Sequence, residues 1–351
     1  MNKYEKIIKK HGARIVISGD SLSYNRYSYD PDPRGEASQC GAGMGSWSFA
    51  LRDRLITGDS SFVYGDEMEF DCESAIGLDA VSDVPFTAML GGRIKTLFPN
   101  GDVSFTLAGN RERIVLYFQK RLDSPCVFDI FADGELKAEN VDTAGDASRF
   151  AGYELMAVSL PCNASKSTHT LRFAVKSGEK LTVVGAGSVY REVILSGVGG
   201  KPTPFFIENF DARIGAYKPD LVLLCLGAND RIRVAPALMR KDMVQLFTKI
   251  YEVNKDAQIL LITPPASNLL DSPYEDRMPY VALDTCRVYD RATALAVQDV
   301  QKAGFCADVL VVRELFEGLE TPIWRVDDIH LTKKGNELLL NAVCERLGIE
   351  D

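Results

Sequence analysis

Two kinds of apolar pattern divide this sequence, and they restrict its fold more than any other feature. In both flanking parts, short runs are almost continuously apolar, as in residues 14–18, which Gly12 and Gly19 bound. Similar runs occupy residues 221–226 and 258–262, and a weaker one occupies 308–312. Continuous apolar runs are typical of strands buried on both faces, as in parallel sheets.

Helical patterns alternate with these strands. One begins near Pro236, a favourable first helical residue, and places Met239, Met243 and Leu246 on one face. A second covers about residues 284–303, and a third runs from a cap at Thr332 to a stop at Gly348. Strands and helices in alternation predict an α/β fold, in which helices cover both faces of a parallel sheet.

The middle of the chain has a different pattern. Between residues 60 and 187, short alternating strands are separated by turn signals such as Asn100-Gly101 and Asp133-Gly134. The predicted strands cover residues 102–107, 113–119, 127–131, 154–160 and 171–175. This pattern predicts an antiparallel β-sandwich inserted into the α/β domain. We therefore expect an α/β domain formed by residues 1–59 and 188–351, interrupted by a sandwich of residues 60–187.

Charge and composition exclude several classes of protein. The net charge of -9 leaves no basic excess for nucleic acid or an anionic membrane. The first ten residues lack the apolar core of a signal peptide, and no run reaches membrane-spanning length. The eight cysteines are scattered without CxxC pairs, which is typical of reduced thiols, and no metal-ligand cluster or phosphate-binding glycine loop occurs. We expect a cytoplasmic protein without metal or cofactor, and without a nucleic-acid or membrane partner.

A serine directly follows the first predicted strand, in Gly19-Asp20-Ser21-Leu22. The carboxyl edge of the sheet would present its hydroxyl where open α/β folds bind ligands. Ser21 is therefore a candidate nucleophile. Taken alone, the fragment is more often a simple turn with a helix cap.

An asparagine closes the run 221–226, in Gly227-Ala228-Asn229-Asp230. Its side-chain amide could donate a hydrogen bond to an oxyanion. The alternative is a turn asparagine in left-handed geometry.

One of the three histidines is placed for catalysis. His11 precedes the first strand and His169 lies in the sandwich, whereas His330 directly precedes the last helix, with Asp327 three residues upstream. An acid at that spacing can hold one ring nitrogen, so that the other accepts a serine proton. The alternative is a helix-capping cluster with a surface histidine.

The order of these fragments resembles the SGNH hydrolases, also called GDSL esterases. Residues 19–22, 227–230 and 327–330 match the first, third and fifth motif blocks of that family. The resemblance implies a flavodoxin-like three-layer fold with Ser21 as nucleophile, His330 as base and Asp327 as the acid that orients it. It also implies an oxyanion hole formed by Ser21, Asn229 and Gly200.

Gly200 is placed by the register of the second block. Residues 193–195 form the second strand, and the glycine-rich loop 196–200 follows it. The family often has an asparagine ahead of this loop, where this chain has Leu195. The glycines alone would also suit a permissive turn.

The resemblance implies ester hydrolysis without a cofactor, and the insert suggests the substrate. Residues 128–134 and 169–173 resemble jelly-roll domains attached to carbohydrate acetyl esterases of the family, although there the sandwich precedes the catalytic domain. We expect hydrolysis of O-acetyl groups on a soluble sugar or oligosaccharide. The alternatives are a general carboxylesterase or lipase, an acyltransferase, and a non-catalytic glycan-binding protein on a hydrolase scaffold. The insert could equally be a packing or dimerisation module, which leaves a homo-oligomer open.

Two further residues are candidate substrate contacts. Trp324 precedes the Asp327 to His330 segment and could stack on a sugar ring, and Arg231 could bind an anionic group. A core tryptophan and a solvated arginine are the alternatives.

Overall fold

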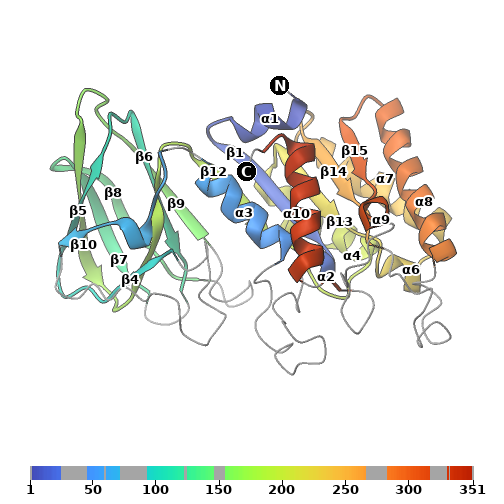
Figure 1. Cartoon of the computed structure of the whole chain (residues 1–351), viewed down its shortest axis with the longest axis horizontal. Coiled ribbons are helices and arrows are strands. Elements are labelled where there is room, and N and C mark those ends of the chain that lie inside the picture. The colour runs from blue at the N-terminus through green and yellow to red at the C-terminus, as the bar shows by residue number, and fades with distance from the viewer. Residues whose placement is uncertain are drawn as a thin grey trace. The chain divides into compact units, whose positions relative to one another are not determined.

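The computed structural model describes residues 2–24, 46–58, 61–71, 93–121, 125–145, 155–265, 283–316, 330–331 and 333–349. The chain divides into two compact units (Figure 1). The first comprises residues 1–55 and 191–351, and the second comprises residues 56–190.

The first unit is built on a five-stranded parallel sheet with the order β12-β1-β13-β14-β15. Its strands are β1 (Ala13–Gly19), β12 (Arg191–Leu195), β13 (Leu221–Cys225), β14 (Gln258–Ile262) and β15 (Ala307–Leu310). The last strand ends earlier than the sequence predicts. Val312 begins a helix instead, because its N–H donates to Oγ1 of Thr263 at 3.0 Å.

Helices lie on both faces of this sheet, which confirms the predicted three-layer α/β fold. They are α1 (Lys3–Ile8), α2 (Ser21–Tyr24), α3 (Trp47–Thr57), α4 (Thr203–Glu208), α5 (Phe210–Arg213), α6 (Asp230–Arg233), α7 (Pro236–Val253), α8 (Leu283–Lys302), α9 (Val312–Phe316) and α10 (Lys333–Leu347). A 3-10 turn, η5 (Gly215–Tyr217), precedes β13. Among the described residues, no helix is both long enough and apolar enough to cross a membrane.

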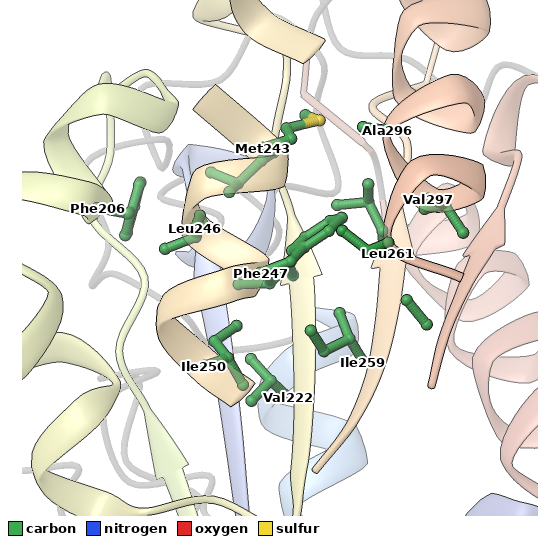
Figure 2. Packing of buried hydrophobic residues seen from close by; sticks show 14 of the residues in the cluster. Phe206, Val222, Met243, Leu246, Phe247, Ile250, Ile259, Leu261, Ala296 and Val297 are labelled. Carbon is green, nitrogen blue, oxygen red and sulfur yellow. The ribbon is translucent and has the colours of Figure 1, made fainter. Parts of the chain in front are cut away.

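Successive strand residues alternate between two separate cores. Ile15 and Leu223 pack with α3 and α10 on one face. Val222 and Leu261 pack with α7 and α8 on the other, around the fully buried ring of Phe247 (Figure 2). Both faces of each central strand are therefore apolar, which accounts for the continuous apolar runs in the sequence.

The second unit consists of two antiparallel sheets, with the orders β3-β5-β10-β7-β8 and β2-β11-β6-β9, and β4 pairs with β11. Side chains from both sheets share one core, which includes Phe118, Phe128 and Phe173. The unit is therefore a β-sandwich. Its strands are β2 (Val63–Tyr64), β3 (Phe70–Asp71), β4 (Lys95–Leu97), β5 (Val103–Ala108), β6 (Arg113–Gln119), β7 (Val127–Ala132), β8 (Glu135–Asp142), β9 (Leu155–Pro161), β10 (Thr168–Ser177) and β11 (Leu181–Gly187), with a 3-10 turn η2 (Gly65–Glu67).

The end of β1 requires a glycine. Gly19 has a φ of 137°, and a Cβ atom there would lie 2.0 Å from the carbonyl oxygen of Cys225. This close approach lets the Asp20 N–H donate to the same carbonyl at 3.0 Å. The pairing of β1 with β13 therefore continues up to the residue that precedes Ser21.

We expect Gly19→Ala to lower the free energy of unfolding by about 3 kcal/mol or more, because the methyl group overlaps the backbone. Gly304→Ala is the matched control, since Gly304 also has a positive φ, 87°, but nothing lies within 4 Å of its Cβ position. The control should cost only the conformational strain, about 1 to 2 kcal/mol. Urea unfolding of both variants measures the difference, and equal losses would contradict the proposed overlap.

Candidate active site

Ser21 lies at the carboxyl edge of the parallel sheet, as the first residue of α2. The strand β1 ends at Gly19, so only Asp20 separates the strand from the serine. The side chain of Ser21 is partly exposed. A hydroxyl in this position is fixed by the sheet on one side and accessible on the other, as a nucleophile requires.

His330 meets this serine from the other end of the chain. Its Nε2 atom lies 2.9 Å from Oγ of Ser21, although the two residues are 309 positions apart. When Nε2 carries no proton, it accepts the hydrogen bond from the hydroxyl, which is the arrangement of a general base and its nucleophile. Asp327 and Trp324 lie outside the described residues, so their roles as orienting acid and sugar contact stay predictions.

The two other predicted oxyanion donors lie on neighbouring loops of the same sheet edge. Val198 N–H donates to Gly19 C=O at 2.8 Å, so the loop after β12 runs along the end of β1. Gly200 follows two residues later, exposed and with a φ of 74°. Asn229 follows β13, the strand on the other side of β1, and directly precedes α6. Their roles as oxyanion donors stay predictions.

A buried carboxylate that the sequence analysis did not identify connects these two loops. The Thr203 N–H, at the start of α4, donates to both carboxylate oxygens of Asp230, at 3.1 and 3.2 Å. Asp230 is fully buried, and burial raises its pKa while the bonds from Thr203 oppose that rise. Asp230 follows Asn229, and Thr203 follows the Gly200 loop. This contact therefore constrains the positions of the two predicted donors relative to each other. The position of Asp230, directly after the candidate Asn229, was the one sequence feature that could have identified it.

Arg231, which the sequence offers as a candidate substrate contact, is buried in the structure. Its side chain is 3% exposed, and the guanidinium donates to the carbonyls of Pro264 and Pro265 at 3.0 and 3.2 Å. It also contacts Asp290 at 3.5 Å. These contacts anchor the turn after β13 to the segment after β14, and they leave the guanidinium buried. The geometry therefore supports a structural role and does not support the expected substrate contact.

Comparison with known proteins identifies part of the chain. Residues 176–338 match the GDSL-like lipase/acylhydrolase family. The chain carries a GDSL-like domain and is an ester-bond hydrolase. The matched segment includes Gly200 and Asn229 as well as His330, whereas Ser21 lies before it. The strand β1, which leads into Ser21, pairs with β12 and β13 of the matched segment, and the side chain of Ser21 contacts His330 of that segment.

Several solved structures are also similar. A peptidoglycan O-acetylesterase is 14% identical, with 99% of this chain and 95% of that chain covered and a TM-score of 0.39. A lipase/acylhydrolase from Enterococcus faecalis is 22% identical over 45% of this chain and 75% of that chain, with a TM-score of 0.36. A family 3 carbohydrate esterase from Clostridium thermocellum is 17% identical over 45% and 70%, with a TM-score of 0.33. Likenesses this weak say nothing of the substrate. No curated protein matches the chain.

Within the described residues of the whole chain, no three His, Cys, Asp or Glu side chains gather as metal ligands. The described cysteines are free thiols, and they include the fully buried Cys225 at the end of β13. Burial raises the pKa of Cys225 well above its ordinary value, which suppresses the nucleophilic thiolate.

Asp20, directly before Ser21, is a buried titratable group with a raised pKa. It is fully buried, and its Oδ1 accepts from the Leu22 N–H at 3.0 Å. Its Oδ2 has no hydrogen-bond partner within the described part of the chain. Burial raises the pKa of Asp20 to about 6, and the nearby Asp230 adds to the rise, whereas the Leu22 bond, His330 and the side chain of Asn229 oppose it.

This raised pKa predicts a particular pH dependence of stability. The folded-state pKa lies above the ordinary value of 3.8, so the folded protein binds the proton more tightly. The contribution of Asp20 to stability is therefore fully present below about pH 4 and is lost as the pH rises through 6, with an upper limit of about 3 kcal/mol. Asp20→Asn keeps an acceptor for Leu22 and removes the titration, so its stability relative to wild type should increase between pH 4.5 and 7.5.

Urea unfolding of both proteins at these two pH values measures the effect. Asp299→Asn is a control without a slope in this window, because the bond from Arg240 lowers the pKa of Asp299 below its ordinary value of 3.8. Its carboxylate is therefore ionised at both pH values, so the stability of that variant relative to wild type should be nearly the same at both. An effect of Asp20→Asn that is the same at both pH values would contradict the assignment.

Proposed function

We propose that this ester hydrolase is a serine esterase that removes short acyl groups, chiefly O-acetyl groups of a soluble carbohydrate, through an acyl-enzyme on Ser21. The observation that carries the proposal is the 2.9 Å separation of Ser21 Oγ and His330 Nε2. A serine hydroxyl is a weak nucleophile by itself, and an adjacent imidazole activates it.

The reaction proceeds in two steps. Ser21 Oγ attacks the ester carbonyl while His330 takes the hydroxyl proton, and the proton then passes to the leaving alcohol as the ester C–O bond breaks. Water next attacks the acyl-enzyme, with His330 again accepting a proton, and the carboxylic acid and free serine result. In this proposal, Asp327 holds the other nitrogen of the imidazole, and the donors at Ser21, Gly200 and Asn229 stabilise the oxyanion.

The residues at the sheet edge support a small, polar substrate. Ser21 is flanked by Asp20, and the neighbouring loops present Gly199, Gly200 and Asn229, which are small or polar. A long acyl chain gains affinity from apolar contact, about 0.8 kcal/mol for each buried methylene group. The described residues beside Ser21 offer little such contact. The sandwich, which resembles sugar-esterase modules in sequence, supports a carbohydrate as the alcohol.

Replacement of the nucleophile is the primary test. Ser21→Ala should reduce turnover of p-nitrophenyl acetate by several orders of magnitude, as loss of a triad serine does elsewhere. A serine-directed phosphonate should label wild type and fail to label this variant. Ser23→Ala is the matched control, because Ser23 lies two residues away on α2 and its hydroxyl donates to the Ser18 carbonyl at 3.0 Å. Near wild-type turnover in Ser21→Ala would refute the proposed nucleophile.

The acyl preference is tested with esters of one alcohol. We expect kcat/KM to fall from p-nitrophenyl acetate to butyrate and octanoate, because the described residues beside Ser21 offer a longer chain little apolar contact. Acetate release from acetylated xylose and acetylated oligosaccharides, measured under the same conditions, tests the carbohydrate. A higher kcat/KM for octanoate would identify a lipase-like enzyme and contradict the proposed substrate class.

A further inference from the structure

The alignment of Ser21 with His330 depends on segments far apart in the chain. On the described side of the histidine, Leu331 follows directly, and its side chain is 1% exposed within the core that α3 and α10 share. Leu22, which follows the serine, belongs to the same core. The two catalytic candidates are thus each attached to a buried leucine on one face of the sheet.

Asn336 holds the residue after the histidine. It lies in α10 and is 1% exposed, and its Nδ2 donates to the Leu331 carbonyl at 3.2 Å. Its Oδ1 accepts from the Trp47 backbone N–H at 3.1 Å, across 289 positions of sequence. One amide therefore contacts both the segment after His330 and the first turn of α3. The amide supplies the donor for one of these bonds and the acceptor for the other.

Trp47 completes the connection to the serine. Its indole Nε1 donates to the Leu22 carbonyl at 2.9 Å, and its side chain is fully buried. The Leu22 N–H meanwhile donates to Asp20, so both polar groups of the residue after Ser21 are held. Its complete burial makes Trp47 a core tryptophan.

We propose that Trp47 and Asn336 are positioning residues, which form a hydrogen-bonded bridge from Leu22 to Leu331 and thereby set the distance between Ser21 Oγ and His330 Nε2. This inference rests on the proposed serine esterase function. The bridge uses three buried bonds, in which Asn336 donates to Leu331, Trp47 donates to Asn336 through its backbone, and Trp47 donates to Leu22 through its indole.

The expected effect is on turnover and not on substrate binding. A misplacement of about 1 Å in a catalytic group can cost about a hundredfold in rate. Neither Trp47 nor Asn336 is exposed to a substrate, so loss of the bridge should leave ground-state binding unchanged. A lower kcat at constant KM is the signature that separates positioning from a general loss of structure.

Two variants break the bridge at different points. Asn336→Asp keeps an acceptor for the Trp47 N–H but sets a carboxylate oxygen against the Leu331 carbonyl. Trp47→Phe keeps the backbone N–H and removes the indole N–H that holds Leu22. Each should lower kcat for p-nitrophenyl acetate by about ten- to a hundredfold, with KM changed by less than about twofold.

A matched control lies at the opposite edge of the same sheet. Asn254 makes the same two kinds of bond as Asn336, since it donates to the Pro219 carbonyl at 2.8 Å and accepts from the Asp256 N–H at 3.1 Å. It lies after α7, beside the segment that leads into β13. Asn254→Asp should therefore lose stability in urea unfolding but retain the wild-type kcat.

The outcomes separate this inference from the proposed function. Folded Asn336→Asp with wild-type kcat would overturn the bridge, and so would an equal loss of kcat in Asn254→Asp. If Asn336→Asp does not fold, Trp47→Phe decides by the same comparison of kcat and KM. If the Ser21→Ala variant is active, the proposed function is refuted. If Ser21→Ala is inactive but both bridge variants keep the wild-type kcat, the bridge alone is refuted.

Discussion

The parallel pairing of β1 with β12 on one side and β13 on the other is the constraint on which the candidate site depends. Parallel strands end at the same edge, so the loops that carry Ser21, Gly200 and Asn229 must emerge together. The ladder extends past the strands themselves, through the bonds Val198 to Gly19 and Asp20 to Cys225. Backbone hydrogen bonds in the sheet therefore set the relative positions of these loops. The side-chain contacts of Asp230, Arg231 and Asn336 add further constraints.

The fold was predictable where burial leaves a simple pattern in the sequence. The strands β13 and β14 are buried on both faces, and helices α7 and α8 each present one apolar face, so their positions followed from periodicity. In the sandwich, β8 was missed, because its residues are mostly exposed and charged and show no apolar alternation. β11 was missed for the opposite reason, since it is buried throughout but contains two glycines. Its pairing with β2, β4 and β6 decides its structure, and the sequence does not display that pairing.

At the candidate site, the sequence could predict residue types at strand ends but not the contacts between distant segments. A serine after β1 and a histidine before α10 are visible as motifs, and the structure brings their side chains within 2.9 Å. The buried residues that hold these segments in place belong to no recognisable sequence motif. Asn336 looks like an ordinary helical residue, and Arg231 looks solvated until Pro264 and Pro265 are placed beside it. Buried polar groups must be hydrogen-bonded, but only the fold determines with which partner.

A whole sandwich is inserted in the chain between β1 and β12. Within each unit, hydrogen bonds join the two chain segments that lie next to the insertion point. In the first unit, Arg191, at the start of β12, donates to the Leu55 carbonyl in α3 at 2.7 Å. In the second unit, Ser61 donates to Ser188 at 2.8 Å, and Arg111 donates to both of these residues. If the inserted segment were a flexible loop, the free-energy cost of closing it would grow by about 0.6 kcal/mol for each doubling of its length. A folded insert with its own ends joined removes that dependence on length, so the chain passes from α3 to β12 as if a short loop connected them.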